Sequence, residues 1–211
     1  MKIKDFFKSF IPKKKSMAVH TNIIPFFYRW EGGESNDPKD SASSYHCGVD
    51  KIHTVKGVTY KAWIGVFGKD EVERFLEMNN DDWGLIFKSK YWDAVKGDQI
   101  KHQSIADCLV SWAWGSGAKT AIRQMQRVLG VTVDGLIGPQ TLGAINSSNE
   151  KELFKKCVAA RRAFFHYITT PSNGRSRIAR KRYENNRRFL RGWLRRLDAF
   201  SKEYAPKENT I

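Results

Sequence analysis

The 211-residue sequence predicts a mainly α-helical fold with at most one small β element, near residues 34–58. Apolar residues recur at helical spacing through most of the chain after residue 59, whereas residues 34–58 are polar and rich in turn-forming residues. Hydrophobic residues make up 41% of the chain, so it has enough apolar surface for a core and is not a disordered protein.

The N-terminal part contains one firm helix. Residues 1–18 are predicted to be a mobile basic tail, or at best a short amphipathic helix. A helix is then expected from Thr21 to Trp30, ended by Gly32 and Gly33 through the positive φ that glycine adopts readily. The polar segment of residues 34–58 is expected to form a loop or a small hairpin.

The rest of the chain is predicted to be helical. Asp70 is expected to cap one helix, and Asp81 and Asp82 to cap the next. The most apolar stretch runs from Ile105 to Trp114 and is predicted to be the buried central helix. Further helices are expected over residues 118–129 and 140–145 and in two closing amphipathic stretches, whose apolar positions include Leu153, Phe154, Cys157, Val158, Phe164, Phe165, Ile168, Phe189, Trp193, Leu197, Phe200 and Tyr204.

Glu31 is the first candidate for chemistry. It follows the end of the first predicted helix, where the helix dipole disfavours a negative charge, and Phe27 and Tyr28 lie on the same helix face. The helix dipole and the partial loss of water beside these aromatic rings both raise the pKa of a carboxyl group, as a general acid working near neutral pH requires. The charge of Arg29 opposes them.

A second carboxyl group, that of Asp40, follows nine residues later across a turn. Two carboxyl groups facing each other across a cleft are the minimum equipment for hydrolysis of a glycosidic bond. The alternative is that both are solvated turn residues.

At these residues the sequence resembles the glycoside hydrolase family 108 muramidases, phage-type endolysins that include proteins labelled secretion activators. The resemblance covers roughly residues 20–200. It rests on ordered blocks: Glu31-Gly32-Gly33, Asn36-Asp37-Pro38, Asp40, residues 54–59, Tyr91-Trp92-Asp93, Gly97-Asp98, residues 124–127, residues 133–142 and residues 189–196.

The resemblance implies a lysozyme-like fold that cleaves the β-1,4 bond between N-acetylmuramic acid and N-acetylglucosamine in peptidoglycan. Glu31 would be the general acid, and Asp40 and Thr54 would hold the attacking water, without cofactor or metal. Inversion would follow from that arrangement, although retention stays open until the carboxyl separation is measured. The expected substrate-binding residues are Tyr28, Asn36, Tyr91, Trp114 and Asp134.

The chain departs from the family pattern between Asp40 and Thr54, where residues 41–53 form a longer link without the usual Gly pair. This insertion could form an extended β-hairpin over the cleft, supply Asp50 in place of Asp40, or block the site. It also carries His46, Cys47 and His53, but two His and one Cys on a loop are more often unliganded than metal-bound.

Three motifs have both a functional and a structural interpretation. Trp112 and Trp114 either stack on sugar rings or fill the core, with Trp114 the better candidate for the cleft. Asp134 and the glycines around it either line a glycan site or simply form turns. The last helix either lies on a membrane surface or packs its apolar stripe on the core with its arginines in water.

The basic charge points to an anionic partner. The chain has 37 Lys and Arg against 22 Asp and Glu, a formal net charge of +15, and residues 161–196 hold twelve basic residues against the single acid Glu184. No nucleic-acid-binding signature accompanies this charge, so no specific nucleic acid is expected. An anionic bacterial envelope, with peptidoglycan as the partner and an anionic membrane surface as a second contact, fits better.

The expected organisation is a tail over residues 1–18, a lysozyme-like catalytic region over 19–115, a peptidoglycan-binding-like segment over 116–150 and basic helices over 151–211 that pack on the same globule. No signal peptide of the usual form and no membrane-spanning run are evident. We therefore expect a monomer made in the cytoplasm that acts at the cell wall or periplasm after release. The alternatives are a non-catalytic peptidoglycan-binding or secretion-accessory protein and, more weakly, a cationic membrane-disrupting protein.

Overall fold

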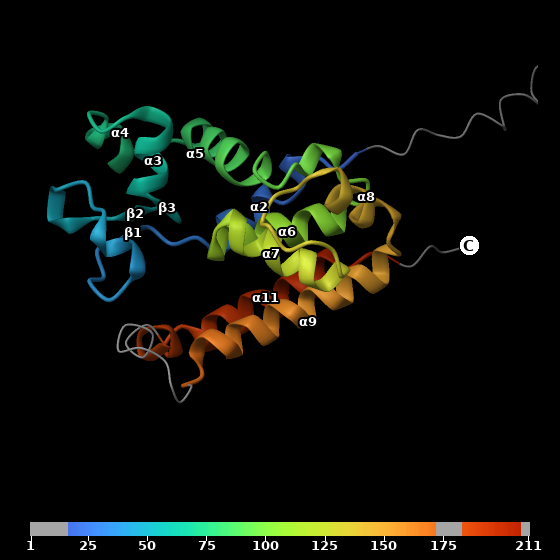
Figure 1. Cartoon of the computed structure of the whole chain (residues 1–211). Helices are drawn as coiled ribbons and strands as arrows, with labels where there is room; N and C mark the ends of the chain where they lie inside the picture. Colours follow the sequence, from blue (N-terminus) through green and yellow to red (C-terminus); the bar gives the residue numbers. More distant parts are fainter. Residues whose placement is uncertain (1–16, 172–182, 208–211) are drawn as a thin grey trace, which may run out of the picture.

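A computed structural model describes residues 17–171 and 183–207 and has a mainly α-helical fold with one small sheet (Figure 1). Most of the tail predicted over residues 1–18 lies outside the described residues. Ala18, however, is buried, and its backbone N–H donates to the carbonyl of Ile100 at 2.9 Å. Ala18, the last residue of the predicted tail, is therefore packed in the fold and is not part of a mobile segment.

The first helix, α2, spans Ile24–Trp30 and follows a short 3₁₀ turn over His20–Asn22. Glu31 leaves the helix in an extended conformation, with φ −86° and ψ 128°. Gly32 and Gly33 are not among the described residues with positive φ, so the expectation that their left-handed conformation ends the helix is wrong. The chain instead turns at Glu31 to enter the sheet.

The small sheet is antiparallel and three-stranded, with strands in the order β1 (Glu34–Ser35), β2 (Thr54–Val55) and β3 (Val58–Thr59). Glu34 pairs with Val55, and Thr54 pairs with both Ser35 and Thr59. Between β1 and β2, residues 41–53 contain two 3₁₀ turns, Ser41–Ser44 and Val49–Lys51, and no strand. The extended hairpin considered for this insertion is therefore not formed.

Short helices follow the sheet: α3 (Tyr60–Phe67), α4 (Val72–Leu76), α5 (Asn80–Ile86), a π-helical turn over Phe87–Trp92 and a 3₁₀ turn over Gly97–Gln99. The predicted caps are displaced. Glu71 occupies the N-cap of α4, without a side-chain hydrogen bond, in place of Asp70. Asn79 caps α5 by accepting from the N–H of Asp82, because its side chain is at the position that reaches the free amides of the first turn.

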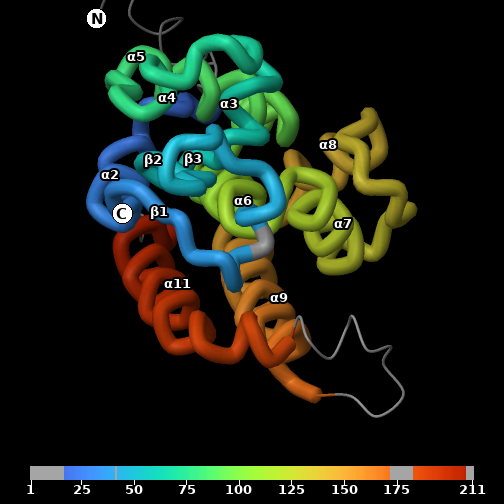
Figure 2. Tube along the Cα trace, turned by 90° about the vertical axis from the view of Figure 1, so that its left-hand side faces the viewer, coloured from blue at the N-terminus to red at the C-terminus, as the bar shows by residue number. Residues whose placement is uncertain are grey.

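The helical body is built on α6 (Gln103–Ser116), which is buried along most of its length, as predicted for the central helix. The helices α7, α8, α9 and α11 span Ala118–Leu129, Pro139–Ser147, Glu150–Thr169 and Leu190–Tyr204. Figures 1 and 2 show α9 and α11 side by side, and both pack on α6. The C-terminal helices thus pack onto the helix that lies at the centre of the fold.

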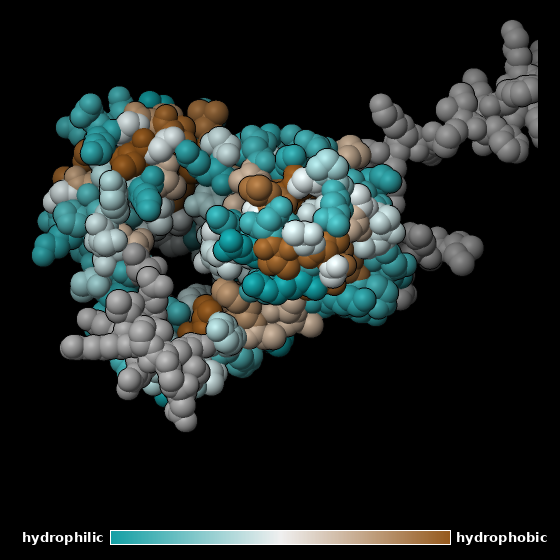
Figure 3. Space-filling view, in the orientation of Figure 1, coloured by the Kyte–Doolittle hydropathy of each residue, from teal (hydrophilic) through white to brown (hydrophobic). Residues whose placement is uncertain are grey.

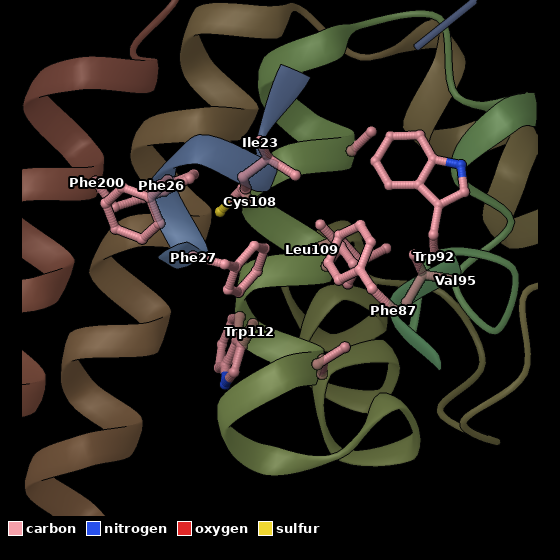
Figure 4. Close-up of a cluster of buried hydrophobic side chains, with 14 of the residues drawn as sticks. Ile23, Phe26, Phe27, Phe87, Trp92, Val95, Cys108, Leu109, Trp112 and Phe200 are labelled. Atoms are coloured by element: carbon pink, nitrogen blue, oxygen red, sulfur yellow. The ribbon is translucent and has the colours of Figure 1, made fainter. Parts of the chain in front are cut away.

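The core joins α2, α6 and α11. Its buried side chains include Phe26 and Phe27 of α2, Trp112 of α6 and Phe200 of α11, which Figure 4 shows together. Among the helices of residues 17–171 and 183–207, none is long and apolar enough to cross a membrane. Figure 3 shows a hollow between the part that carries the sheet and the helical body.

Candidate active site

Glu31 lies at the junction between α2 and the sheet, and its side chain is only 12% exposed. Its Oε1 atom is 2.5 Å from Nη2 of Arg196, a residue of α11. A carboxyl group that sequence alone places at a helix end is therefore covered by the last helix of the fold.

Aromatic side chains surround this carboxyl group. The indole N–H of Trp114 donates to it, and the ring centroid of Trp114 is 4.6 Å from that of Tyr91 and 5.0 Å from that of Phe27. Of the two tryptophans weighed from the sequence, Trp112 is fully buried in the core and Trp114 lies at the site. Burial also raises the pKa of the Tyr91 hydroxyl to about 12, with a contribution from the Glu31 charge.

The pKa of Glu31 is raised above its usual value because burial disfavours the charged form. The Arg196 charge, its contact with the carboxylate and the Trp114 hydrogen bond act in the opposite direction, but burial is the largest effect. The direction is the one expected for a general acid. Arg29, expected to oppose it, instead pairs with Glu203 at 2.5 Å and is half-exposed.

Gly57, at a turn of the sheet, packs against the Glu31 side chain. Lys56 and Gly57 form the two-residue turn between β2 and β3 with φ values of +47° and +78°. A Cβ atom on Gly57 would lie 2.1 Å from Oε2 of Glu31. The turn therefore packs directly against the carboxyl group and leaves no room for a side chain.

Arg196 is the functional candidate that the sequence reasoning missed. Its guanidinium lies 5.7 Å from the ring centroid of Phe26 and 5.6 Å from that of Phe27, and its side chain is 21% exposed. A signal was available: Arg196 is three residues after Trp193 and four before Phe200, so it lies on the apolar face of α11. An arginine on that face needs a buried partner.

Asp40 lies at the start of the first 3₁₀ turn of the insertion and accepts from the N–H of Ala42 at 2.9 Å. It lines a pocket of about 470 Å³ together with Gly115 and Trp193. The same two residues line a smaller pocket, of about 90 Å³, that Arg196 borders. The pocket beside Asp40 and the one beside Arg196 thus share two lining residues.

Thr54 sits on the middle strand of the sheet, and its hydroxyl lies 2.8 Å from Nδ1 of His53. The ring of His53 is fully buried, and its Nε2 lies 3.3 Å from the backbone carbonyl of Asp37. The orientation of Thr54 is therefore fixed by a buried histidine from the insertion, a positioning contact that the sequence did not reveal.

The other predicted binding residues are spread more widely. Tyr28 is 44% exposed with its ring 4.9 Å from that of Trp83, and the Asn36 side chain donates to the carbonyl of Asp50 at 3.4 Å. Asp134 is held in the turn between α7 and α8 by hydrogen bonds from Gln126 and Leu136. Figure 2 shows this turn, in yellow, on the opposite side of the fold from α2, so Asp134 is not brought to Glu31.

The other side chains of the insertion have structural surroundings. Asp50 is exposed and adopts a φ of +42°, and Nδ1 of His46 accepts from the N–H of Gly48. Among the residues that the structure describes, no three His, Cys, Asp or Glu side chains are grouped so as to hold a metal ion.

Three ion pairs join residues 29–37 to residues 188–203 in antiparallel order. Arg29 pairs with Glu203, Glu31 with Arg196, and Asp37 with Arg188 at 2.6 Å. The segment that carries the candidate acid is therefore aligned along α11 by charge as well as by packing.

A carboxyl group with a raised pKa, set among aromatic rings between a small sheet and a helical body, is typical of a lysozyme-like glycoside hydrolase. Residues 24–117 match the family model described as Glycosyl hydrolase 108, and residues 120–198 match that described as Predicted Peptidoglycan domain. The chain thus carries a glycosyl hydrolase 108 domain followed by a predicted peptidoglycan domain, which confirms the resemblance read from its motifs.

The solved structures that the chain resembles include one titled "Structure of Brucella abortus SagA". The two chains are 21% identical, the match covers 90% of this chain and 97% of that one, and the TM-score is 0.70. This similarity shows a shared fold along nearly the whole chain. No protein among the curated sequences compared matches the chain.

Proposed function

We propose that the protein is a muramidase that hydrolyses the β-1,4 bond between N-acetylmuramic acid and N-acetylglucosamine in peptidoglycan. The single observation that carries the proposal is the buried Glu31 carboxyl group with a raised pKa, inside a glycosyl hydrolase 108 domain. A carboxyl group that holds its proton near neutral pH can donate that proton to the leaving oxygen.

In this mechanism Glu31 protonates the glycosidic oxygen as the bond breaks. Asp40 orients the attacking water or stabilises the oxocarbenium-like state, and Thr54, held by His53, assists with the water. Tyr28, Asn36, Tyr91 and Trp114 bind the sugar strand, and Arg196 positions Glu31. No metal or cofactor takes part. Proton NMR of the first-formed product identifies its anomer and so shows whether hydrolysis inverts or retains the configuration at the anomeric carbon.

The decisive experiment compares the wild type with Glu31→Gln on purified peptidoglycan, measuring reducing-sugar release and muropeptide masses. New N-acetylmuramic acid reducing ends are expected from the wild type alone, at a rate at least about 100-fold above that of the variant. Glu34→Gln, an exposed glutamate three residues further on, is the matched control and is expected to keep full activity. Full activity in Glu31→Gln would refute the assignment.

A second candidate is a peptidoglycan-binding or secretion-accessory protein with the same fold and no turnover. The observation in its favour is the ion pair with Arg196, which stabilises the ionised form of Glu31, the form that cannot donate a proton. Binding to sacculi without release of reducing ends, in the wild type as in Glu31→Gln, would favour this candidate.

We also propose that the protein acts as a monomer at the cell wall or periplasm after release, where its positive charge attracts it to anionic envelope surfaces. Light scattering gives the mass in solution, and leakage of anionic vesicles tests the membrane contact. Leakage that persists at the wild-type level in Glu31→Gln would show membrane activity separate from hydrolysis.

A further inference from the structure

The pocket of about 470 Å³ beside Asp40 is built from two distant parts of the chain. One wall is the segment just before the insertion, with Lys39 and Asp40; the other is the segment that leads into and begins α11, with Asn185, Asn186, Phe189 and Trp193. The first wall belongs to the glycosyl hydrolase domain and the second to the predicted peptidoglycan domain. The ion pair between Asp37 and Arg188 joins the two segments next to the pocket.

The lining combines flat aromatic surface with neutral amide groups and one charged group of each sign. The rings of Phe189 and Trp193 are stacked, with centroids 5.8 Å apart and an angle of 23° between their planes. Trp193 also packs on Phe165, at 5.4 Å between centroids, so the aromatic wall is supported from behind. Both rings are half-buried, and the amide groups of Asn185 and Asn186 lie beside them.

This combination suits a sugar carrying an acetamido group. A pyranose ring offers a face of C–H groups to an aromatic wall and a rim of hydroxyl groups to amides and carboxylates, and suitably placed polar groups fix such a ligand's orientation. The lining carries one carboxylate, that of Asp40, and one ammonium group, that of Lys39, so its formal charge is balanced and suits a neutral sugar. The volume lies within the usual range of small-molecule sites.

The pocket shares a helix with the residue that contacts Glu31. Gly115 and Trp193 line it and line the smaller pocket bordered by Arg196, whose guanidinium pairs with Glu31. Trp193 and Arg196 are three residues apart on α11, so the aromatic wall and the cation beside Glu31 are carried by adjacent turns of one helix.

We propose that this pocket binds one neutral 2-acetamido sugar of the glycan strand, so that the predicted peptidoglycan domain completes a subsite of the hydrolase and does not act as a separate binding module. The inference rests on the proposed muramidase function for its substrate class. It adds Asn185, Phe189 and Trp193 as residues that bind the strand beside Asp40.

The test measures binding of chitotetraose, a neutral oligomer of N-acetylglucosamine, by calorimetry in the Glu31→Gln variant. Adding Phe189→Leu or Asn185→Ala is expected to weaken binding about tenfold, whereas Phe189→Tyr, which keeps the aromatic face, restores it. The matched controls are Tyr167→Leu on the exposed face of α9 and Asn80→Ala at the start of α5, both expected to leave binding unchanged. Thermal melting of each variant shows that it folds.

With Glu31 intact, the same two pocket substitutions are expected to raise KM on soluble glycan strands about tenfold and to change kcat little. Unchanged affinity and KM in both variants would overturn the inference, as would displacement of chitotetraose by a free stem tetrapeptide. Hydrolysis by Glu31→Gln would instead refute the proposed function, and the two failures are therefore distinguishable.

Discussion

Glu31 is held between burial, which favours its neutral form, and Arg196, which favours its charged form. An acid catalyst needs both a proton to give and a stable carboxylate afterwards. The buried carboxyl group, with a cation on one side and Trp114 on another, has the surroundings that the proposed acid requires. Substitution of Arg196 separates the two effects.

Replacing Arg196 with Met removes the charge that lowers the pKa of Glu31 while burial still raises it. The pKa of Glu31 is therefore expected to rise, and the alkaline limb of the pH–activity profile, where the proton is lost, to move to higher pH. The variant is also expected to lose roughly 10- to 100-fold in kcat because the carboxyl group is no longer held in place.

The matched control for this prediction is Arg195→Met, the neighbouring arginine, which is exposed over Trp30. Its profile is expected to match that of the wild type. Profiles that coincide for all three proteins would show that Arg196 does not influence Glu31.

Gly57 is a second residue whose contact with Glu31 can be tested by substitution. Gly57→Ala is expected to reduce activity at least about 100-fold, because the new Cβ atom would lie 2.1 Å from Glu31 Oε2 and displace it. Gly48→Ala is the control, since Gly48 also has positive φ, at +97°, but a Cβ atom added there would have no neighbour within 4 Å. Both variants are expected to lose about 1–2 kcal/mol of stability from backbone strain, measured by chemical denaturation, and only Gly57→Ala to lose activity.

Some helices and turns follow from the local sequence, and others do not. The helix that spans Ala118–Leu129 has the predicted bounds, because its apolar stripe and the glycines that flank it are local signals. The caps of α4 and α5 differ from the predicted ones because several acidic or amide residues stand near each start, and only the fold selects one. The insertion over 41–53 has no strand, since a buried His53 and short turns organise it instead.

The candidate site shows the same division. The sequence singles out Glu31, Tyr91 and Trp114, each of which belongs to a motif or a helix end, and the structure brings these three side chains together. Arg196 and the pocket beside Asp40 depend on contacts between segments more than 140 residues apart, which no local pattern encodes. Asp134 is predicted to bind glycan, but its hydrogen bonds to Gln126 and Leu136 match the turn-forming alternative.

The central helix α6 carries a buried carboxyl group whose effect on stability can be measured. Asp107 is 1% exposed and accepts from Gln103, and burial raises its pKa to about 7. The folded state therefore holds this proton more strongly than the unfolded state does. Its contribution to stability is complete below about pH 4 and is lost as the pH rises through about 7.

Wild-type protein is therefore expected to lose a few kcal/mol of unfolding free energy between about pH 4 and pH 8, at about 1.4 kcal/mol per unit of pKa shift. Asp107→Asn, which keeps the acceptor for Gln103, is expected to flatten this dependence. Asp70→Asn, at an exposed position, serves as the control and keeps the wild-type slope. Chemical denaturation at several pH values gives the comparison, and equal slopes in all three proteins would contradict it.

We expect the whole molecule to fold as one cooperative unit that builds the candidate site, although two family models divide it near residue 118. The helices α7, α9 and α11 all pack on α6, and the pairs Glu31–Arg196 and Asp37–Arg188 cross the division. The hydrolase domain alone would expose the core face of α6 and leave Glu31 without its cation.

Residues 17–118 produced alone are therefore expected to hydrolyse peptidoglycan at less than about a hundredth of the full-length rate. They are also expected to lack a cooperative thermal transition in circular dichroism. Production of residues 119–207 in the same cell is the control and is expected to restore part of the activity. A fragment of residues 17–118 with the full-length rate would show that α11 has no part in the site.

The antiparallel pairing of residues 29–37 with residues 188–203 also sets the order of events during synthesis. Glu31 leaves the ribosome 165 residues before Arg196, which corresponds to roughly 10–30 s of translation. Throughout that interval the nascent chain lacks the cation, the pocket wall and the helix that covers α6. On the proposed function, a growing polypeptide of this sequence is therefore expected to be inert until α11 docks, and activity to begin in one step once translation has passed that helix.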